Sequence, residues 1–132
     1  MDYSYVNNFR KLGFGMFVHF GLYSVLGKGE WHFQYTRDNR ISDEVAMKQY
    51  IEKTFPRFKV APNWAKELCK TAKKAGCRYV TLTTRHHEGF SLYDTCGLND
   101  FDAPHSPTHR DLVQEFVDAC REYNLLPVFY HT

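Results

Sequence analysis

Short apolar runs alternate with amphipathic stretches along the chain, in a repeated strand-then-helix order. Residues 14–20, 79–84 and 126–130 are brief, mainly apolar or β-branched runs, which is typical of strands buried on both faces. Between them, residues 64–75 and 112–123 place their apolar side chains on one stripe of a helix. Strands that follow one another through crossover helices are parallel, so the pattern predicts an α/β fold.

Residues at the ends of these two helices support their boundaries. Pro62 suits the first turn of the earlier helix, and Gly76 suits the left-handed position after it. For the later helix, residues 106–108 (Ser-Pro-Thr) supply capping chemistry in front, and Asn124 takes the left-handed position behind. Each helix is therefore expected to stop just before a strand.

The segment between the first strand and the next helix is unusually long. Residues 23–40 are polar and aromatic, and a connection of this length is usually functional or mobile. Residues 42–53 then predict a helix, with Ser42 as its N-cap.

Composition narrows the function classes. The chain has 132 residues, which suggests one domain, and its 17 basic and 15 acidic residues give a net charge of +2. No basic run is interleaved with aromatic residues, so we expect no nucleic-acid partner. Aromatic residues make up 17%, which fits either a large core or a sugar-binding surface.

Cysteine spacing and hydropathy exclude further classes. The four cysteines lack Cys-x-x-Cys spacing, so we expect neither structural zinc nor a disulfide framework. No apolar run approaches the ~20 residues needed to cross a bilayer, and the first residues lack the pattern of a signal peptide. We therefore expect no membrane association and a cytoplasmic location.

Histidines stand where each predicted strand ends. His19 ends the first strand, His86 and His87 follow the second, and His131 ends the third. Parallel strands bring these ends to one edge of a sheet, where α/β proteins bind ligands. Neighbouring residues in an extended chain point to opposite sides, so His86 and His87 do not both pack in one core layer. The pattern predicts a shared polar site.

The residues alone leave two architectures open, a doubly wound sheet and a (β/α)8 barrel. Neither a Gly-x-Gly-x-x-Gly motif nor a P-loop follows any predicted strand, which disfavours nucleotide binding.

Several motifs, in order along the chain, resemble those of a known family. They are His19-Phe20-Gly21-Leu22-Tyr23-Ser24, then Gly29-Glu30-Trp31, then Arg85-His86-His87-Glu88-Gly89-Phe90, then Arg110-Asp111-Leu112-Val113. The first three are similar to the His-Trp-Gly-x-Tyr-Ser, Glu-Trp and Lys-His-His-Asp-Gly-Phe elements of the α-L-fucosidases of glycoside hydrolase family 29. The likeness runs from about Lys11 to Tyr130.

The resemblance implies both a fold and an activity. The fold is the N-terminal three βα units of a (β/α)8, TIM-like barrel, with parallel strands and outer helices. The activity is hydrolysis of α-L-fucosidic bonds with retention of configuration, and the expected partner is a fucosylated oligosaccharide or glycoconjugate. No cofactor is implied.

The resemblance also assigns substrate-binding residues: His19, Glu30, Trp31, His86 and His87. A neutral imidazole both donates to and accepts from sugar hydroxyls, and a carboxylate accepts charge-assisted hydrogen bonds. The indole of Trp31 would lie against the apolar face of fucose, with Phe20 and Phe90 as weaker candidates for that role. No function is carried to His131, because the family commonly has Tyr-Ser where this chain has His131-Thr132.

No catalytic residue is expected within this chain. A retaining glycosidase needs two carboxyl groups ~5–5.5 Å apart, and the family's nucleophile follows its fourth strand. Glu88 and Asp94 match no catalytic position. We therefore expect residues 1–132 to form a single, incomplete domain, the N-terminal part of the catalytic barrel. Its open strand edge would favour self-association or pairing with a complementary fragment.

Two other functions stay open at this point. One is a non-catalytic sugar-binding or assembly fragment. The other is a metal-dependent barrel hydrolase that uses the histidines as ligands, which ranks last because adjacent histidines diverge on a strand. No metal site is expected.

Overall fold

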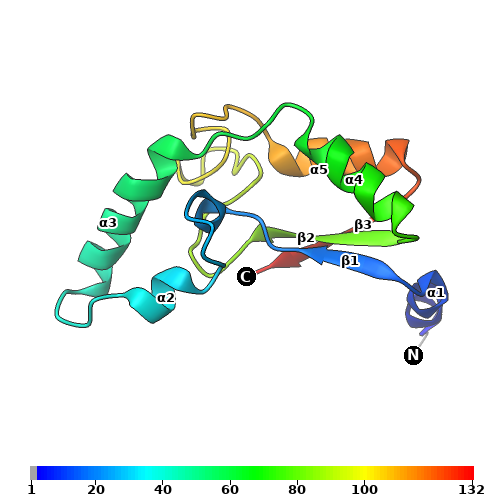
Figure 1. Cartoon of the computed structure of the whole chain (residues 1–132), viewed down its shortest axis with the longest axis horizontal. Helices are drawn as coiled ribbons and strands as arrows, with labels where there is room; N and C mark the ends of the chain where they lie inside the picture. Colours follow the sequence, from blue (N-terminus) through cyan, green and yellow to red (C-terminus); the bar gives the residue numbers. More distant parts are fainter. Residues whose placement is uncertain (1–2) are drawn as a thin grey trace.

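The computed structural model describes residues 3–132 and shows an α/β fold built on one parallel sheet (Figure 1). Strands β1 (Gly15–Val18), β2 (Tyr79–Arg85) and β3 (Leu126–His131) lie side by side in that order. Both pairings are parallel, with Phe17 opposite Thr81. The α/β prediction is therefore confirmed, as three parallel strands joined through helices.

The other regular elements are helices and short helical turns. They are α1 (Ser4–Leu12), η1 (Leu22–Val25), α2 (His32–Thr36), α3 (Asp43–Thr54), η2 (Phe55–Arg57), α4 (Trp64–Lys74) and α5 (Leu112–Glu122). The predicted loop at residues 23–40 thus contains most of η1 and all of α2, and α1 was not predicted. Elements η1 and α2 are too short to show an apolar stripe, whereas α1 is amphipathic but has no buried residue.

The core lies between the sheet and two helices, α4 and α5, which cover one of its faces (Figure 1). Val80 and Leu82 of β2 are fully buried there, together with Phe116 of α5. The Sγ atoms of Cys69 and Cys120 lie 3.7 Å apart within this layer. The cysteines in the predicted helices thus serve as small core residues.

The opposite face of the sheet is largely open in the part of the chain that the structure describes. Register neighbours in parallel strands share a face, so Phe17, Thr81 and Val128 lie together on this side. Phe17 is 55% exposed. The face is covered at its two ends: the ring of Phe9 in α1 lies 5.1 Å from that of Tyr79, and Tyr23 of η1 contacts the fully buried Thr83.

Helix ends agree only in part with the sequence pattern. Ser42 caps α3 as predicted, since its hydroxyl accepts from the Val45 N–H at 3.3 Å. Pro62 lies before the N-cap of α4, which is Asn63, and not in the first turn. The cap of α5 is Asp111 and not residues 106–108, because those residues close a separate turn in which the Ser106 hydroxyl bonds Ala103.

Two left-handed positions are confirmed. Gly76 has φ of 83° and Asn124 has φ of 52°, directly before the approaches to β2 and β3. Both residue types tolerate this conformation, which lets each helix turn back onto the sheet.

We expect the Asp111 cap to contribute measurably to stability. Its two carboxylate oxygens accept from the Gln114 N–H at 2.8 Å and the Asp94 N–H at 3.0 Å. Asp111→Ala should lower the free energy of unfolding by about 1–2 kcal/mol, the range measured for lost N-caps. Thr108→Ala, the matched control, should cost less than half as much. Urea denaturation followed by circular dichroism measures both, and equal losses would favour the cap that the sequence suggested.

Candidate functional site

Rings from separate segments meet at the C-terminal end of the sheet. His19 directly follows β1, and His86 and His87 follow β2. The ring centroid of His86 lies 5.2 Å from that of His19 and 4.7 Å from that of His87. Trp31, directly before α2, lies 4.8 Å from His87 and 5.8 Å from His86. The structure thus brings together His19, Trp31, His86 and His87, which we call the histidine cluster.

These four side chains differ in exposure. His86 is only 5% exposed, whereas His19 and His87 are exposed and Trp31 is 39% exposed. The cluster therefore has a buried base and an accessible rim.

The surroundings of His86 favour the neutral form of its imidazole. Burial lowers its pKa, and the neighbouring imidazoles of His87 and His19 lower it further. Glu30 is half-buried beside the cluster, and its negative charge raises the pKa of His86 only in part. A neutral imidazole presents one donor and one acceptor, and Glu30 adds an acceptor carboxylate. With the indole of Trp31, these groups match the hydroxyls and apolar faces of a monosaccharide.

The third strand contributes Tyr130 to this region, and not His131. The ring of Tyr130 lies 5.7 Å from His86 and 6.5 Å from His19. His131 instead lies 6.0 Å from Tyr93. Alternation along a strand explains the difference, because neighbouring residues point to opposite faces. The sequence analysis missed Tyr130, although alternation combined with the strand register would have identified it.

A hydroxyl of β2 fixes the segment that follows β1. Thr83 Oγ1 accepts from the Phe20 N–H at 3.0 Å and donates to the Phe20 carbonyl at 3.2 Å. The Tyr23 hydroxyl lies 3.0 Å from the same oxygen, and burial raises the pKa of Tyr23 well above its usual range. The backbone next to His19 is therefore anchored to the strand that leads to His86.

Glu88 is the carboxylate most deeply embedded beside the cluster. Its Oε1 accepts from the Leu22 N–H at 3.0 Å, and its Oε2 accepts from the Tyr50 hydroxyl. The residue is 5% exposed. Burial raises its pKa to about 7, although these hydrogen bonds work in the opposite direction. The sequence analysis noted Glu88 only as matching no catalytic position, because sequence alone does not reveal its burial or its distant partners.

Two weaker candidates for sugar stacking pack in or against the core. Phe90 is 1% exposed, with its ring 5.0 Å from that of Phe58 and 5.3 Å from that of Phe101. Phe20 packs against Trp64 at 5.1 Å. The idea that Phe90 lies against a sugar is therefore wrong for this structure, whereas Phe20 is only partly buried and its role stays a prediction.

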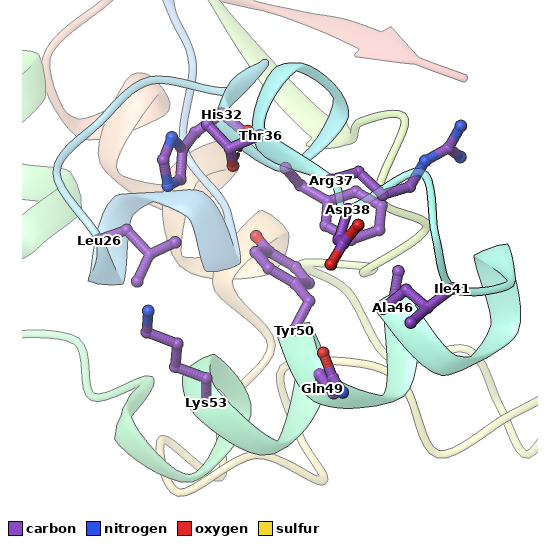
Figure 2. A pocket seen from close by; sticks show the side chains of 11 residues that line it. Leu26, His32, Thr36, Arg37, Asp38, Ile41, Ala46, Gln49, Tyr50 and Lys53 are labelled. Atoms are coloured by element: carbon purple, nitrogen blue, oxygen red, sulfur yellow. Dashed lines mark hydrogen bonds between the residues drawn. The ribbon is translucent and has the colours of Figure 1, made fainter.

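A separate cavity of about 230 Å³ lies between α2 and α3 (Figure 2). Figure 2 shows His32 and Lys53 on either side of Leu26, with Tyr50 in the middle of the cavity. The expected substrate-binding residues lie outside its lining. The cavity adjoins the histidine cluster through Tyr50, whose hydroxyl reaches Glu88.

Neither a metal-binding group of side chains nor a membrane-spanning helix is found among the described residues. Across residues 3–132, no group of three or more His, Cys, Asp or Glu side chains is arranged to hold a metal ion. In the same part of the chain, no helix combines the length and apolar character needed to cross a membrane.

Comparison with known proteins gives one consistent family. Residues 2–132 match the family model described as Alpha-L-fucosidase. Rat tissue alpha-L-fucosidase (Rattus norvegicus) is 33% identical over 132 residues, covering 94% of this chain and 29% of the relative. The chain therefore spans less than a third of the length of that curated relative.

Solved structures agree with this result. Alpha-L-fucosidase isoenzyme 1 from Paenibacillus thiaminolyticus superposes with a TM-score of 0.79 and 38% identity, covering 96% of this chain and 28% of that one. The alpha-fucosidase of Thermotoga maritima in complex with fucose gives a TM-score of 0.74 and 30% identity, covering 99% and 36%.

The pKa of Glu88 predicts a pH-dependent stability difference. Because its pKa rises from 4.5 to about 7 on folding, the folded state holds the proton more tightly, and stability falls as pH rises through this window. Glu88→Gln keeps a neutral group there, so at pH 5, near the start of this window, it should lie within about 1 kcal/mol of the wild type. At pH 8 it should be more stable by on the order of 3 kcal/mol.

Thermal and urea denaturation at both pH values measure the stability difference between Glu88→Gln and the wild type. Both proteins contain His86, so the titration of His86 cancels in this difference. Glu52→Gln, an exposed site on α3, is the matched control and should show no such trend. An offset between Glu88→Gln and wild type that is the same at pH 5 and pH 8 would contradict the assignment.

Proposed function

The chain belongs to the α-L-fucosidase family, and we propose that it carries the fucose-binding part of a retaining α-L-fucosidase. The observation that carries this proposal is the histidine cluster at the C-terminal end of the parallel strands. The match to a Thermotoga maritima enzyme in complex with fucose supports the choice of sugar. The proposed substrate is a fucosylated oligosaccharide or glycoconjugate.

Each proposed contact has a chemical reason. The imidazoles of His19, His86 and His87 donate to and accept from the hydroxyls of fucose. Glu30 accepts hydrogen bonds from two hydroxyls with charge-assisted strength. The partly exposed indole of Trp31 packs against the apolar face and the methyl group.

We propose further that residues 1–132 are the N-terminal part of a (β/α)8 barrel and form a single, incomplete domain. Helices α4 and α5 cover one face of the sheet, whereas the other face exposes Phe17. In a closed barrel the interior is filled by side chains from alternate strands, which this face would supply. The short span of the chain on its relatives supports the same proposal.

The hydrolytic carboxylates are proposed to come from outside these residues. Retention requires a nucleophile and an acid/base group ~5–5.5 Å apart. Glu88 lies near the cluster, but both of its oxygens already accept hydrogen bonds from Leu22 and Tyr50. Sugar binding without turnover is therefore the second candidate function for the chain alone.

Ligand-induced stabilisation tests the binding proposal. L-Fucose at 100 times its dissociation constant should raise the free energy of unfolding by about 2.7 kcal/mol. His86→Ala and Trp31→Ala should each weaken binding at least about tenfold, a loss of roughly 1.4 kcal/mol. His109→Ala, at an exposed histidine outside the cluster, is the matched control.

Two further measurements sharpen this test. D-Fucose, the mirror-image sugar, should not stabilise the chain, and equal stabilisation by both sugars would remove the basis of the proposal. A nitrophenyl α-L-fucoside should bind without being hydrolysed by the chain alone, whereas turnover would show that the carboxylate pair lies within these residues.

The open sheet face predicts concentration-dependent association. Sedimentation velocity at micromolar concentration should show self-association, because an uncovered apolar face and a free strand edge favour it. Phe17→Lys should shift the distribution toward monomer. Tyr35→Lys, at an 81% exposed position on α2, should not. A monodisperse wild-type monomer would argue against the incomplete barrel.

A further inference from the structure

We propose that Glu88 is a positioning residue that holds the parts of the histidine cluster in register with one another. The inference rests on the proposed function, because it concerns the same sugar-binding residues. Glu88 itself does not touch the sugar in this proposal. It acts through the backbone after β1 and through α3.

The first step is the contact between the two strand-end loops. Glu88 follows His87 directly, and its Oε1 accepts from the Leu22 N–H at 3.0 Å. Leu22 lies three residues after His19. One buried hydrogen bond therefore ties the loop that carries His86 and His87 to the loop that carries His19.

The second step is the absence of a side chain at Gly21. A Cβ added there would lie 2.5 Å from Glu88 Oε1 and 2.7 Å from the Tyr23 ring. Only glycine leaves room for the carboxylate to approach the Leu22 amide. The close approach is thus built into the loop after β1.

The third step leads from Glu88 to Trp31. Glu88 Oε2 accepts from the Tyr50 hydroxyl of α3, and the Tyr50 ring lies 4.9 Å from that of Phe33. Phe33 belongs to α2, which begins directly after Trp31. A displacement of the carboxylate would therefore move Tyr50, then α2, and with it the indole above His87.

The length of the side chain matters here. The family motif that this segment resembles has Asp where this chain has Glu88. Aspartate is one methylene shorter, so in this chain it would not reach the Leu22 amide and the Tyr50 hydroxyl together without movement of the loop. Glu88→Asp is accordingly the most informative substitution.

Glutamine, in contrast, preserves both contacts. Its carbonyl oxygen accepts from the Leu22 N–H, and its amide donates to the Tyr50 oxygen. A protonated Glu88 does the same through its hydroxyl. The titratable groups that act on it are Tyr50 of α3 and Tyr23 of η1, and His87 precedes it in the sequence. Positioning therefore persists in both protonation states.

Two measurements on the full 132-residue chain test the inference. The first is the dissociation constant of L-fucose. The second is the pKa of His86, measured by hydrogen–deuterium exchange at the imidazole C2 position with mass spectrometry, which also works on associated chains. Glu88→Asp should weaken L-fucose binding about tenfold. In this variant the pKa of His86 should rise toward its ordinary value, because the ring would be less buried and farther from the imidazoles of His87 and His19.

The remaining variants separate positioning from general stability. Glu88→Gln should bind L-fucose within about twofold of wild type, and Tyr50→Phe, which removes only the hydroxyl, should weaken binding about threefold. Glu52→Asp is the matched exposed control on α3 and should change neither quantity. If Glu88→Asp fails to fold, Tyr50→Phe still decides the question through the pKa of His86.

The outcomes are distinguishable. Glu88→Asp and Tyr50→Phe variants with lower melting temperatures but unchanged affinity and unchanged His86 pKa would overturn the positioning role and leave Glu88 purely structural. Absence of L-fucose binding by the wild type would defeat the proposed function, while the His86 pKa would still report whether Glu88 places that ring.

Discussion

The buried carboxylate of Glu88 constrains the rest of the structure around it. A carboxyl group that is 5% exposed needs partners inside the protein, because an unpaired buried charge costs several kcal/mol. Its two oxygens find donors on η1 and α3, which are far apart in the sequence. These two hydrogen bonds fix the loops after β1 and β2 and helix α3 relative to one another. The histidine cluster depends on this arrangement.

The strands and the helices α4 and α5 were predictable because packing repeats along the chain. Alternation of strands with apolar stripes determined β2, β3, α4 and α5 to within a few residues. Caps were harder to predict. Residues 106–108 and Asp111 all carry capping chemistry, and Asp111 is selected by a tertiary partner, the Asp94 N–H. The short α2 gave no periodic signal, since five residues make little more than one turn.

The site was predictable where position along a strand determines location. Strand-end histidines indicated a common edge, and His19 and His86 do meet there. The face on which each strand residue lies was not predicted, because the third strand places Tyr130 beside them and turns His131 away. The buried partners of Glu88 were not predicted either. Nothing local in the sequence shows that Tyr50, 38 residues before Glu88, is its partner.

The open face of the sheet bears on how binding and chemistry are divided. In the proposed function the histidine cluster holds a pyranose at the C-terminal ends of β1 and β2, while the middle of the open face, around Phe17, has no covering layer within residues 3–132. Both oxygens of Glu88 are committed to holding this half together, so the residue is unavailable for attack at an anomeric carbon. Under the proposed function, binding groups and reacting carboxylates belong to different segments of the fold. Such a division matches the chemistry of retention. Hydrogen bonds to the hydroxyls accelerate hydrolysis only if they are stronger in the transition state than in the bound substrate. Reaching that transition state requires a separate pair of carboxyl groups.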